Sequence, residues 1–190
     1  MGTVKRITRN EYSKFVIGIH YAHRWPSISY AFGLFDEKKL VGCVTYGSPA
    51  SPFLCKGVCG DGFRLDVLEL NRLVLENNKK NEASYLVGNS LRMLGEIKNA
   101  IIVSYADTKY NHIGYVYQAT NFLFTGTTKP RTDMASVNGK HSRHHLGDRN
   151  NRVNRSAKHR YVTFIGDKRF KNKAKEALKY RVLPYPKDIK

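Results

Sequence analysis

The sequence is short of acidic residues, of cysteine and of long apolar runs. Its 190 residues contain 15 Asp and Glu against 33 Lys and Arg, a formal net charge of +18 that favours an anionic partner. The three cysteines are an odd number, which excludes a disulfide framework. No apolar run approaches the roughly 20 residues that span a bilayer, and Met1–Arg6 lacks the apolar region of a signal peptide. We therefore expect a soluble, cytoplasmic protein with no membrane partner.

The rest of the composition is that of a folded chain. Hydrophobic residues make up 41% of the sequence, enough for the core of a single domain over residues 1–190. Cys55 and Cys59 have the spacing of two zinc ligands, but no second pair accompanies them. We therefore expect these cysteines to lie in the core or in a loop and not to bind zinc.

Most of the excess positive charge lies in the last third of the chain. Residues 129–190 hold 18 of the 33 basic residues and only 5 of the 15 acidic ones. Within them, residues 138–160 are polar and poor in large apolar side chains, which predicts a basic loop. Such a loop either keeps the protein soluble or lies along a phosphate backbone and releases counterions, and the charge asymmetry favours the second role. The residues expected to bind nucleic acid are Arg143, Arg149, Arg152, Arg155, Lys158 and Arg160.

Hydrophobic periodicity predicts an α/β fold on a mixed sheet. Thr8 and Glu11 form a capping box for a first helix, and a continuous apolar run over 100–106 predicts a strand buried on both faces. The expected elements, in order, are a hairpin of strands 29–35 and 40–47, a loop over 49–62, a strand over 66–75, a helix capped by Ser84, the strand 100–106, a short helix 115–121, strands 122–126 and 160–165, and a closing helix 171–180. The middle strand–helix–strand unit implies a parallel crossover.

Two features of this unit predict binding of an anion. Arg72 stands in an apolar strand, where it either pairs with a carboxylate such as Glu69 or points into a ligand cleft. The turn after that strand carries Lys79 and Lys80, and a helix beginning near Ser84 would add unpaired backbone N–H groups at the same point. We expect Lys79, Lys80 and Ser84 to bind the phosphates of a cofactor.

Residues around the buried strand are candidates for catalysis. Asp107 ends the strand 100–106, where open α/β sheets place functional side chains, although it also suits a turn or a helix cap. Tyr117 follows on a short helix, where a phenol can donate a proton. His20 and His23 end the first helix, and a base or positioning role is favoured over a metal site because no third ligand is evident.

Six blocks in the same order resemble the Mom family of phage DNA-modification proteins and cover nearly the whole chain. They are His20-Tyr21, the hairpin end 41–49, the strand 68–73, Ser104–Asp107, the segment 114–121 and the tail 183–187. The resemblance implies a GNAT-like acyltransferase fold, with an antiparallel N-terminal hairpin, a parallel strand–helix–strand core and helices on both faces of the sheet. It also implies conversion of adenine N6 in DNA to the carbamoylmethyl form, which blocks restriction enzymes.

The same resemblance implies an active site and its partners. Carried over position by position, it places His20, Arg72, Ser90, Asp107 and Tyr117 in or beside the active site. Its substrate is double-stranded DNA with a flipped adenine, on which Tyr46 or Tyr115 could stack. Its donor is acetyl-CoA or a related acyl compound, although residues 77–83 lack the usual glycine-containing pyrophosphate motif. A bound iron, with His20 as one ligand, and a dimeric state remain open.

Two alternatives lie outside DNA modification. A GNAT-like enzyme acting on another amine would transfer its group without DNA. A non-catalytic nucleic-acid-binding module would keep its activity after changes at Asp107 or Tyr117.

Overall fold

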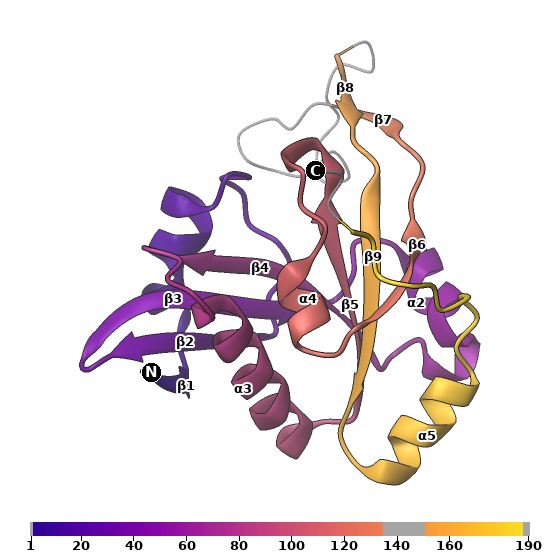
Figure 1. Ribbon diagram of the computed structural model, residues 1–190, viewed down its shortest axis with the longest axis horizontal. Helices are drawn as coiled ribbons and strands as arrows, with labels where there is room; N and C mark the ends of the chain where they lie inside the picture. The colour runs from indigo at the N-terminus through magenta and orange to yellow at the C-terminus, as the bar shows by residue number, and fades with distance from the viewer. Residues whose placement is uncertain (1, 135–150, 188–190) are drawn as a thin grey trace.

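The computed structural model describes residues 2–134 and 151–187, which form a seven-stranded mixed sheet and a separate two-stranded ribbon (Figure 1). The sheet order is β1-β2-β3-β4-β5-β9-β6, and only β4 and β5 are parallel neighbours. The strands are β1 (Thr3–Arg6), β2 (Tyr30–Asp36), β3 (Lys39–Gly47), β4 (Val67–Leu75), β5 (Ala100–Asp107), β6 (Leu123–Thr127), β7 (Arg131–Met134), β8 (Arg152–Arg155) and β9 (Lys158–Ile165). The predicted α/β class, hairpin and parallel crossover are confirmed.

Helices cover both faces of the sheet, as expected. One face carries α3 (Glu82–Ile97) and the short α4 (Tyr115–Ala119), which pack on the largest core cluster. The other face carries α2 (Pro52–Cys59) and α5 (Lys168–Glu176), which share a second cluster with β5 and β9. Among the described residues, no helix has the length and apolar character to cross a membrane.

The N-terminal helix positions the first predicted site residue. Thr8 and Glu11 form the predicted capping box at the start of α1 (Arg9–Ser13), and the chain continues as a π-helical turn over Lys14–Ile19. Phe15 and Val16 of that turn are fully buried against β3 and β4, which anchors the turn to the sheet. His20 follows immediately, in extended backbone.

Several predicted elements differ from the structure. The segment 49–62 contains α2, because Pro52 suits the first turn of a helix and Val58 and Cys59 pack into the core. The prediction of a basic loop over 138–160 is wrong for residues 152–160, which form β8 and the start of β9. Residues 138–150 lie outside the described ranges. β1 and β7 were not predicted.

Helix ends also differ. Asn81 precedes α3 in left-handed backbone, so Ser84 lies inside the helix and is not its cap. The closing helix α5 runs over Lys168–Glu176, where Asp167 caps it by accepting from the Phe170 N–H at 2.7 Å.

Candidate active site

The sheet opens between its two parallel strands. β4 and β5 pair only over Val67–Glu69 and Ile101–Val103, and beyond these residues they diverge (Figure 1). The Ser104 hydroxyl donates to the Leu70 carbonyl at 3.3 Å where they separate. We call the opening beyond this contact the wedge. It lies at the carboxyl ends of parallel strands, where α/β sheets place ligands.

A β-bulge aims two charged side chains to the same side of the wedge. Tyr46 pairs with Leu70 and Thr45 with Arg72, so Asn71 is an extra residue in β4. Because Gly47 pairs with Glu69, the bulge puts Glu69 and Arg72 on one face of the sheet. Asn71 holds the bulge by accepting from the Thr45 hydroxyl at 2.6 Å and donating to the Ser27 carbonyl at 2.6 Å.

Arg72 supplies a guanidinium with an open hydrogen-bond position. Its two terminal nitrogens donate to the Asn71 carbonyl at 2.6 Å and the Arg24 carbonyl at 3.0 Å. Its Nε is buried and has no partner among the described residues. Of the two alternatives that the sequence offered for Arg72, the ion pair with Glu69 is absent from the salt bridges of the described chain. A buried N–H without an acceptor is costly, so a ligand oxygen placed there would be bound favourably.

Glu69 is a partly buried carboxylate beside this guanidinium. Burial raises its pKa above the ordinary value, against the opposing effect of the charges of Arg72, Lys158 and Arg24 and of a backbone hydrogen bond from Ala50, which favour the charged form. A carboxylate with a raised pKa is a better proton acceptor than a fully stabilised one. The sequence indicated Glu69 only as a partner for Arg72, although an acidic residue between Leu68 and Leu70 in a buried strand is itself unusual and points to a function.

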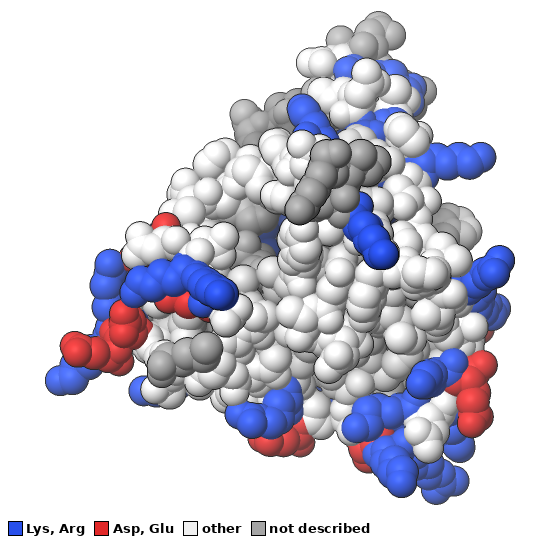
Figure 2. Space-filling view, viewed as in Figure 1, with Lys and Arg blue, Asp and Glu red and all other residues white. Residues whose placement is uncertain are grey.

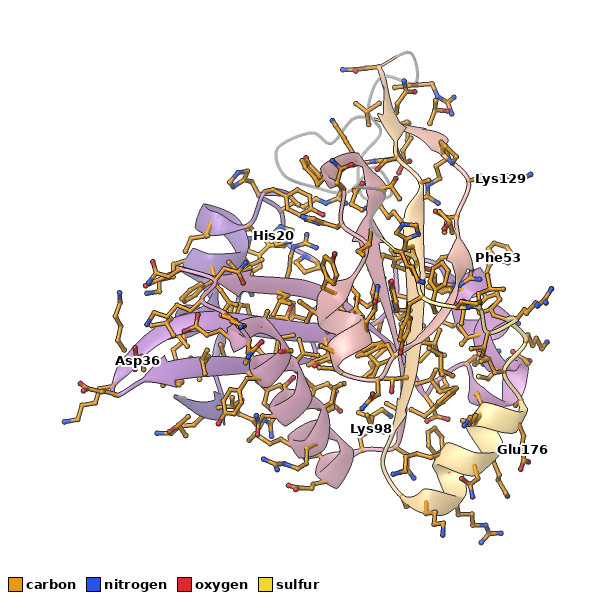
Figure 3. All side chains as sticks on the ribbon, in the orientation of Figure 1. His20, Asp36, Phe53, Lys98, Lys129 and Glu176 are labelled. Carbon is orange, nitrogen blue, oxygen red and sulfur yellow. The ribbon has the colours of Figure 1, made fainter. Side chains whose placement is uncertain are left out.

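His20 lies where the π-helical turn meets the wedge (Figure 3). Burial, with the charges of Arg72, His23 and Arg24, lowers its pKa to about 4, so the ring is neutral at pH 7. Its Nδ1 accepts from the Ala22 N–H at 3.0 Å. The neutral ring therefore carries its proton on Nε2 and offers a ligand a donor. As a base it would first have to give up the contact with Ala22.

Two tyrosines bridge the mouth of the wedge. Tyr21 follows His20 and stacks on it at 4.4 Å, and Tyr110 follows β5. Their ring centroids lie 5.1 Å apart, yet they remain 54% and 47% exposed. Figure 2 shows a recess in this part of the surface with Lys or Arg atoms at its floor. Exposed rings beside positive charge are suited to stacking of a nucleobase.

The tyrosines predicted for stacking behave differently. Tyr46 is fully buried, so its predicted role in stacking is wrong. Tyr115 is 61% exposed on α4. The adjacent positions of Tyr21 and Tyr110 could not be inferred from sequence, because 88 residues lie between them in the chain.

Tyr117 lies at the inner end of the wedge. It hydrogen-bonds the Ser104 hydroxyl and packs against Phe122 and Tyr161 at 5.4 and 5.3 Å. Burial raises its pKa to about 12, so the phenol is protonated and can act as a donor. The structure thus brings Tyr117 to the point where β4 and β5 separate.

Ser90 belongs to the core of the fold. It is fully buried in α3, where its hydroxyl donates to the Val87 carbonyl at 2.8 Å and hydrogen-bonds the Tyr46 hydroxyl at 2.6 Å. Tyr46 is equally buried, and burial raises its pKa. These contacts give Ser90 a role in joining α3 to β3.

Asp107 is surrounded by donors. It accepts from the Lys158 ammonium at 2.8 Å, from the Lys109 N–H at 3.0 Å and from the Ser156 hydroxyl. Burial acts to raise its pKa, but these hydrogen bonds outweigh burial and lower the pKa below the ordinary value. Asp107 is therefore a stable anion that ties the end of β5 to β9, and it is a weak base.

A groove runs along α3 on the face that carries α4. Its volume is about 750 Å³, and its lining includes Asn81 and Ser84 at the start of α3, and Arg92 and Lys171 farther along. No side chain caps the first turn of α3. The Glu82 N–H donates to the Lys79 carbonyl at 3.1 Å, and the N–H groups that follow it in this turn can donate to an anion. The groove fits a phosphate-bearing cofactor.

The predicted lysines of this site lie just outside the groove lining. Lys79 forms an exposed ion pair with Asp36 at 3.6 Å, and Lys80 is exposed beside it. Both add positive charge at the start of α3, while Ser84 alone of the three lines the groove.

Residues 2–134 and 151–187 do not bring together a set of metal ligands. No group of three or more His, Cys, Asp or Glu side chains is placed there to hold an ion. His20 and His23 each use Nδ1 in local contacts, with the Ala22 N–H and the Ile17 carbonyl. Within the described ranges, no third ligand accompanies His20 and His23.

The predicted nucleic-acid-binding residues divide into three groups. Arg143 and Arg149 lie outside the described residues. Lys158 pairs with Asp107, and Arg160 donates to Thr125 at 2.9 Å and covers the Tyr180 ring at 3.4 Å, so both have internal roles. Arg152 and Arg155 lie on β8, away from the main sheet.

Comparisons with known proteins give a consistent result. The sequence model of the Mom protein family matches residues 2–187. A curated relative, the methylcarbamoylase Mom of Escherichia phage Mu, is 27% identical over 186 residues, covering 88% of this chain and 76% of the relative.

Similar solved structures are acetyltransferases. A Bacillus subtilis acetyltransferase in complex with CoA has a TM-score of 0.52 at 10% identity, covering 87% of this chain and 99% of its own. The Escherichia coli ribosomal-protein-S18-alanine N-acetyltransferase gives 0.54 at 10% identity, with 88% and 96% covered. Arabidopsis thaliana NAA60 in complex with acetyl-CoA gives 0.53 at 14% identity, with 87% and 99% covered. This likeness confirms the predicted acetyltransferase-like fold.

Proposed function

The chain belongs to the Mom protein family, and on that premise we propose that this transferase converts adenine N6 in double-stranded DNA to the carbamoylmethyl form. The observation that carries the proposal is the exposed pair of Tyr21 and Tyr110 over the wedge. Such a pair can hold a purine that has left the duplex. Flipping the base costs a few kcal/mol, and phosphate contacts from a chain of net charge +18 offset that cost.

Within this proposal, Glu69 is the proton acceptor. Adenine's exocyclic nitrogen is a poor nucleophile, so its proton must leave as the new N–C bond forms. Burial raises the pKa of Glu69, which makes it the better base, whereas Asp107 is held by three donors. The Nε2 proton of His20 and the Nε proton of Arg72 are then donors that orient the two reactants.

The product sets a requirement for the donor. A carbamoylmethyl group is joined to N6 through a methylene carbon, so the donor must present such a carbon with a leaving group, and that bond breaks as N6 attacks. Phosphates on such a donor would lie at Ser84 and the start of α3, with the methylene carbon in the wedge. An acyl-CoA thioester would instead supply an activated carbonyl, and attack of N6 there would release the thiol and leave an N6 amide. The carbamoylmethyl product therefore requires a donor whose leaving group is on the methylene carbon.

A second candidate function is therefore N-acyl transfer to another amine, which the acetyltransferase fold favours. It predicts transfer from acetyl-CoA to a peptide or small amine in the absence of DNA. It also predicts that DNA neither competes with that acceptor nor becomes modified.

The proposal is tested by restriction protection. Plasmid from cells producing the wild-type protein should resist enzymes whose sites contain adenine, and plasmid from cells producing Glu69→Gln or Arg72→Gln should be cut. Lys98→Gln is the matched control, because Lys98 pairs with Asp66 at the other end of the sheet from His20 (Figure 3). Full cutting of wild-type plasmid, with soluble protein in the cells, would refute the proposal.

A further inference from the structure

A two-stranded ribbon stands off the main sheet. β7 and β8 are inserted between β6 and β9 and pair only with each other (Figure 1). Their register joins Arg131 to Arg155, Thr132 to Asn154, Asp133 to Val153 and Met134 to Arg152. Because cross-strand partners share a face and successive residues alternate, this register defines the two faces of the ribbon.

The inner face combines two arginines with one aspartate and adjoins the wedge. It carries Arg131, Asp133, Val153 and Arg155, and the Asp133 carboxylate lies 3.8 Å from Arg155 and 4.0 Å from Arg131. Asp133 and Arg155 also act electrostatically on Arg24, whose carbonyl holds Arg72. The ribbon therefore stands beside the mouth of the wedge.

The outer face has a different chemistry. Thr132, Arg152 and Asn154 are exposed, and Met134 is partly buried. Arg152 donates to the Thr132 hydroxyl at 3.2 Å, which holds its guanidinium on this face. None of these four residues is acidic, and Figure 2 shows Lys and Arg atoms on the described part of the projecting end of the molecule. Besides positive charge, this face carries an amide, a hydroxyl and a thioether, groups that can contact base edges as well as phosphates.

We propose that the outer face of the ribbon reads base edges in the major groove of the duplex beside the target adenine, with Arg152 and Asn154 as specificity-determining residues. The inference rests on the proposed function, since it takes DNA as the substrate. The major groove admits a two-stranded ribbon, and guanidinium and carboxamide groups form paired hydrogen bonds with guanine and adenine there. A base held at Tyr21 and Tyr110 puts the neighbouring groove within reach of the ribbon, because the inner face adjoins the wedge.

The experiment selects bound duplexes from a randomised DNA pool with the full-length protein. Wild-type protein should enrich a sequence motif. Arg152→Ala and Asn154→Ala should each reduce the preference for one base pair by about 5- to 150-fold. Lys129→Ala is the control, because Lys129 points away from the body near the ribbon (Figure 3). Loss of a phosphate contact there should lower the slope of log affinity against log salt by up to about 0.9 and leave the motif unchanged.

Folding is checked by thermal unfolding, and the milder variants Arg152→Lys and Asn154→Ser repeat the test if an alanine variant unfolds. Binding without any motif, or a motif unchanged in all folded variants, would overturn the inference. Selection is independent of chemistry, so failure of the proposed function is distinguishable: a motif read by Arg152 and Asn154 without modified adenine supports the ribbon and contradicts only the reaction.

Discussion

Replacing Ser90 with alanine tests whether this residue supports the fold or acts on a substrate. Both Ser90 and Tyr46 are fully buried, and their hydroxyls are 2.6 Å apart. The substitution leaves the Tyr46 hydroxyl without that partner and away from water, which costs about 1–3 kcal/mol. For a chain of this size, 1 kcal/mol corresponds to about 2–4 °C. We therefore expect the melting temperature to fall by roughly 2–12 °C.

A double-mutant cycle makes this test quantitative. Tyr46→Phe alone should cost less, about 0.5–1.5 kcal/mol, because Ser90 keeps its bond to the Val87 carbonyl at 2.8 Å. The double variant should lose less than the sum of the two, since neither hydroxyl is then left unpaired. Thermal unfolding by circular dichroism gives the energies, and restriction protection gives the activity. An unchanged melting temperature for Ser90→Ala together with lost protection would refute the structural role and place Ser90 at the reaction.

Three further predictions concern the wedge. Tyr21→Leu and Tyr110→Leu should each weaken binding of a single-stranded oligonucleotide by about 5- to 150-fold, the loss of roughly 1–3 kcal/mol of stacking; 2-aminopurine fluorescence measures it, and unchanged quenching by the variants would count against base stacking there. Because His20 has a pKa of about 4 when folded and an ordinary value of 6.5, the unfolded chain binds more protons between those values. Stability should therefore fall as pH drops from about 6.5 towards 4, by at most roughly 3 kcal/mol, and His20→Gln should flatten that dependence in denaturant titrations; an equal pH dependence in both proteins would contradict the buried neutral ring. Asp107→Asn should destabilise the fold by about 1–3 kcal/mol through loss of its charged hydrogen bonds, while some DNA modification persists; complete loss of modification in a protein of unchanged stability would instead assign Asp107 to the chemistry.

Local patterns predicted much of the sheet. The capping box at Thr8, the apolar run of β5 and the hairpin of β2 and β3 each depend on neighbouring residues, so sequence alone located them. The strand β8 was not predicted, because it does not depend on neighbouring residues. Its residues are polar and lack a core face, and they form a strand because Arg152–Arg155 pair with the distant Arg131–Met134. No local signal encodes that pairing.

The candidate site was predicted only in part, because some of its contacts join residues that are far apart in the chain. Arg72, His20 and Tyr117 were candidates from the sequence, and all three lie at the wedge. The pairing of Tyr21 with Tyr110 depends on how the π-helical turn packs against the sheet relative to the end of β5, which sequence patterns do not give. Two of the three donors to Asp107 come from β9 and from the segment before it, so its charge state also could not be read from the sequence.

The most direct test of the central claim is the intact mass of adenine nucleosides from DNA of cells that produce this protein. The account predicts deoxyadenosine carrying one carbamoylmethyl group on N6, present with the wild-type protein and lost in Glu69→Gln. Unmodified deoxyadenosine alone, or deoxyadenosine bearing an N6 amide, in cells that contain soluble folded protein would contradict it.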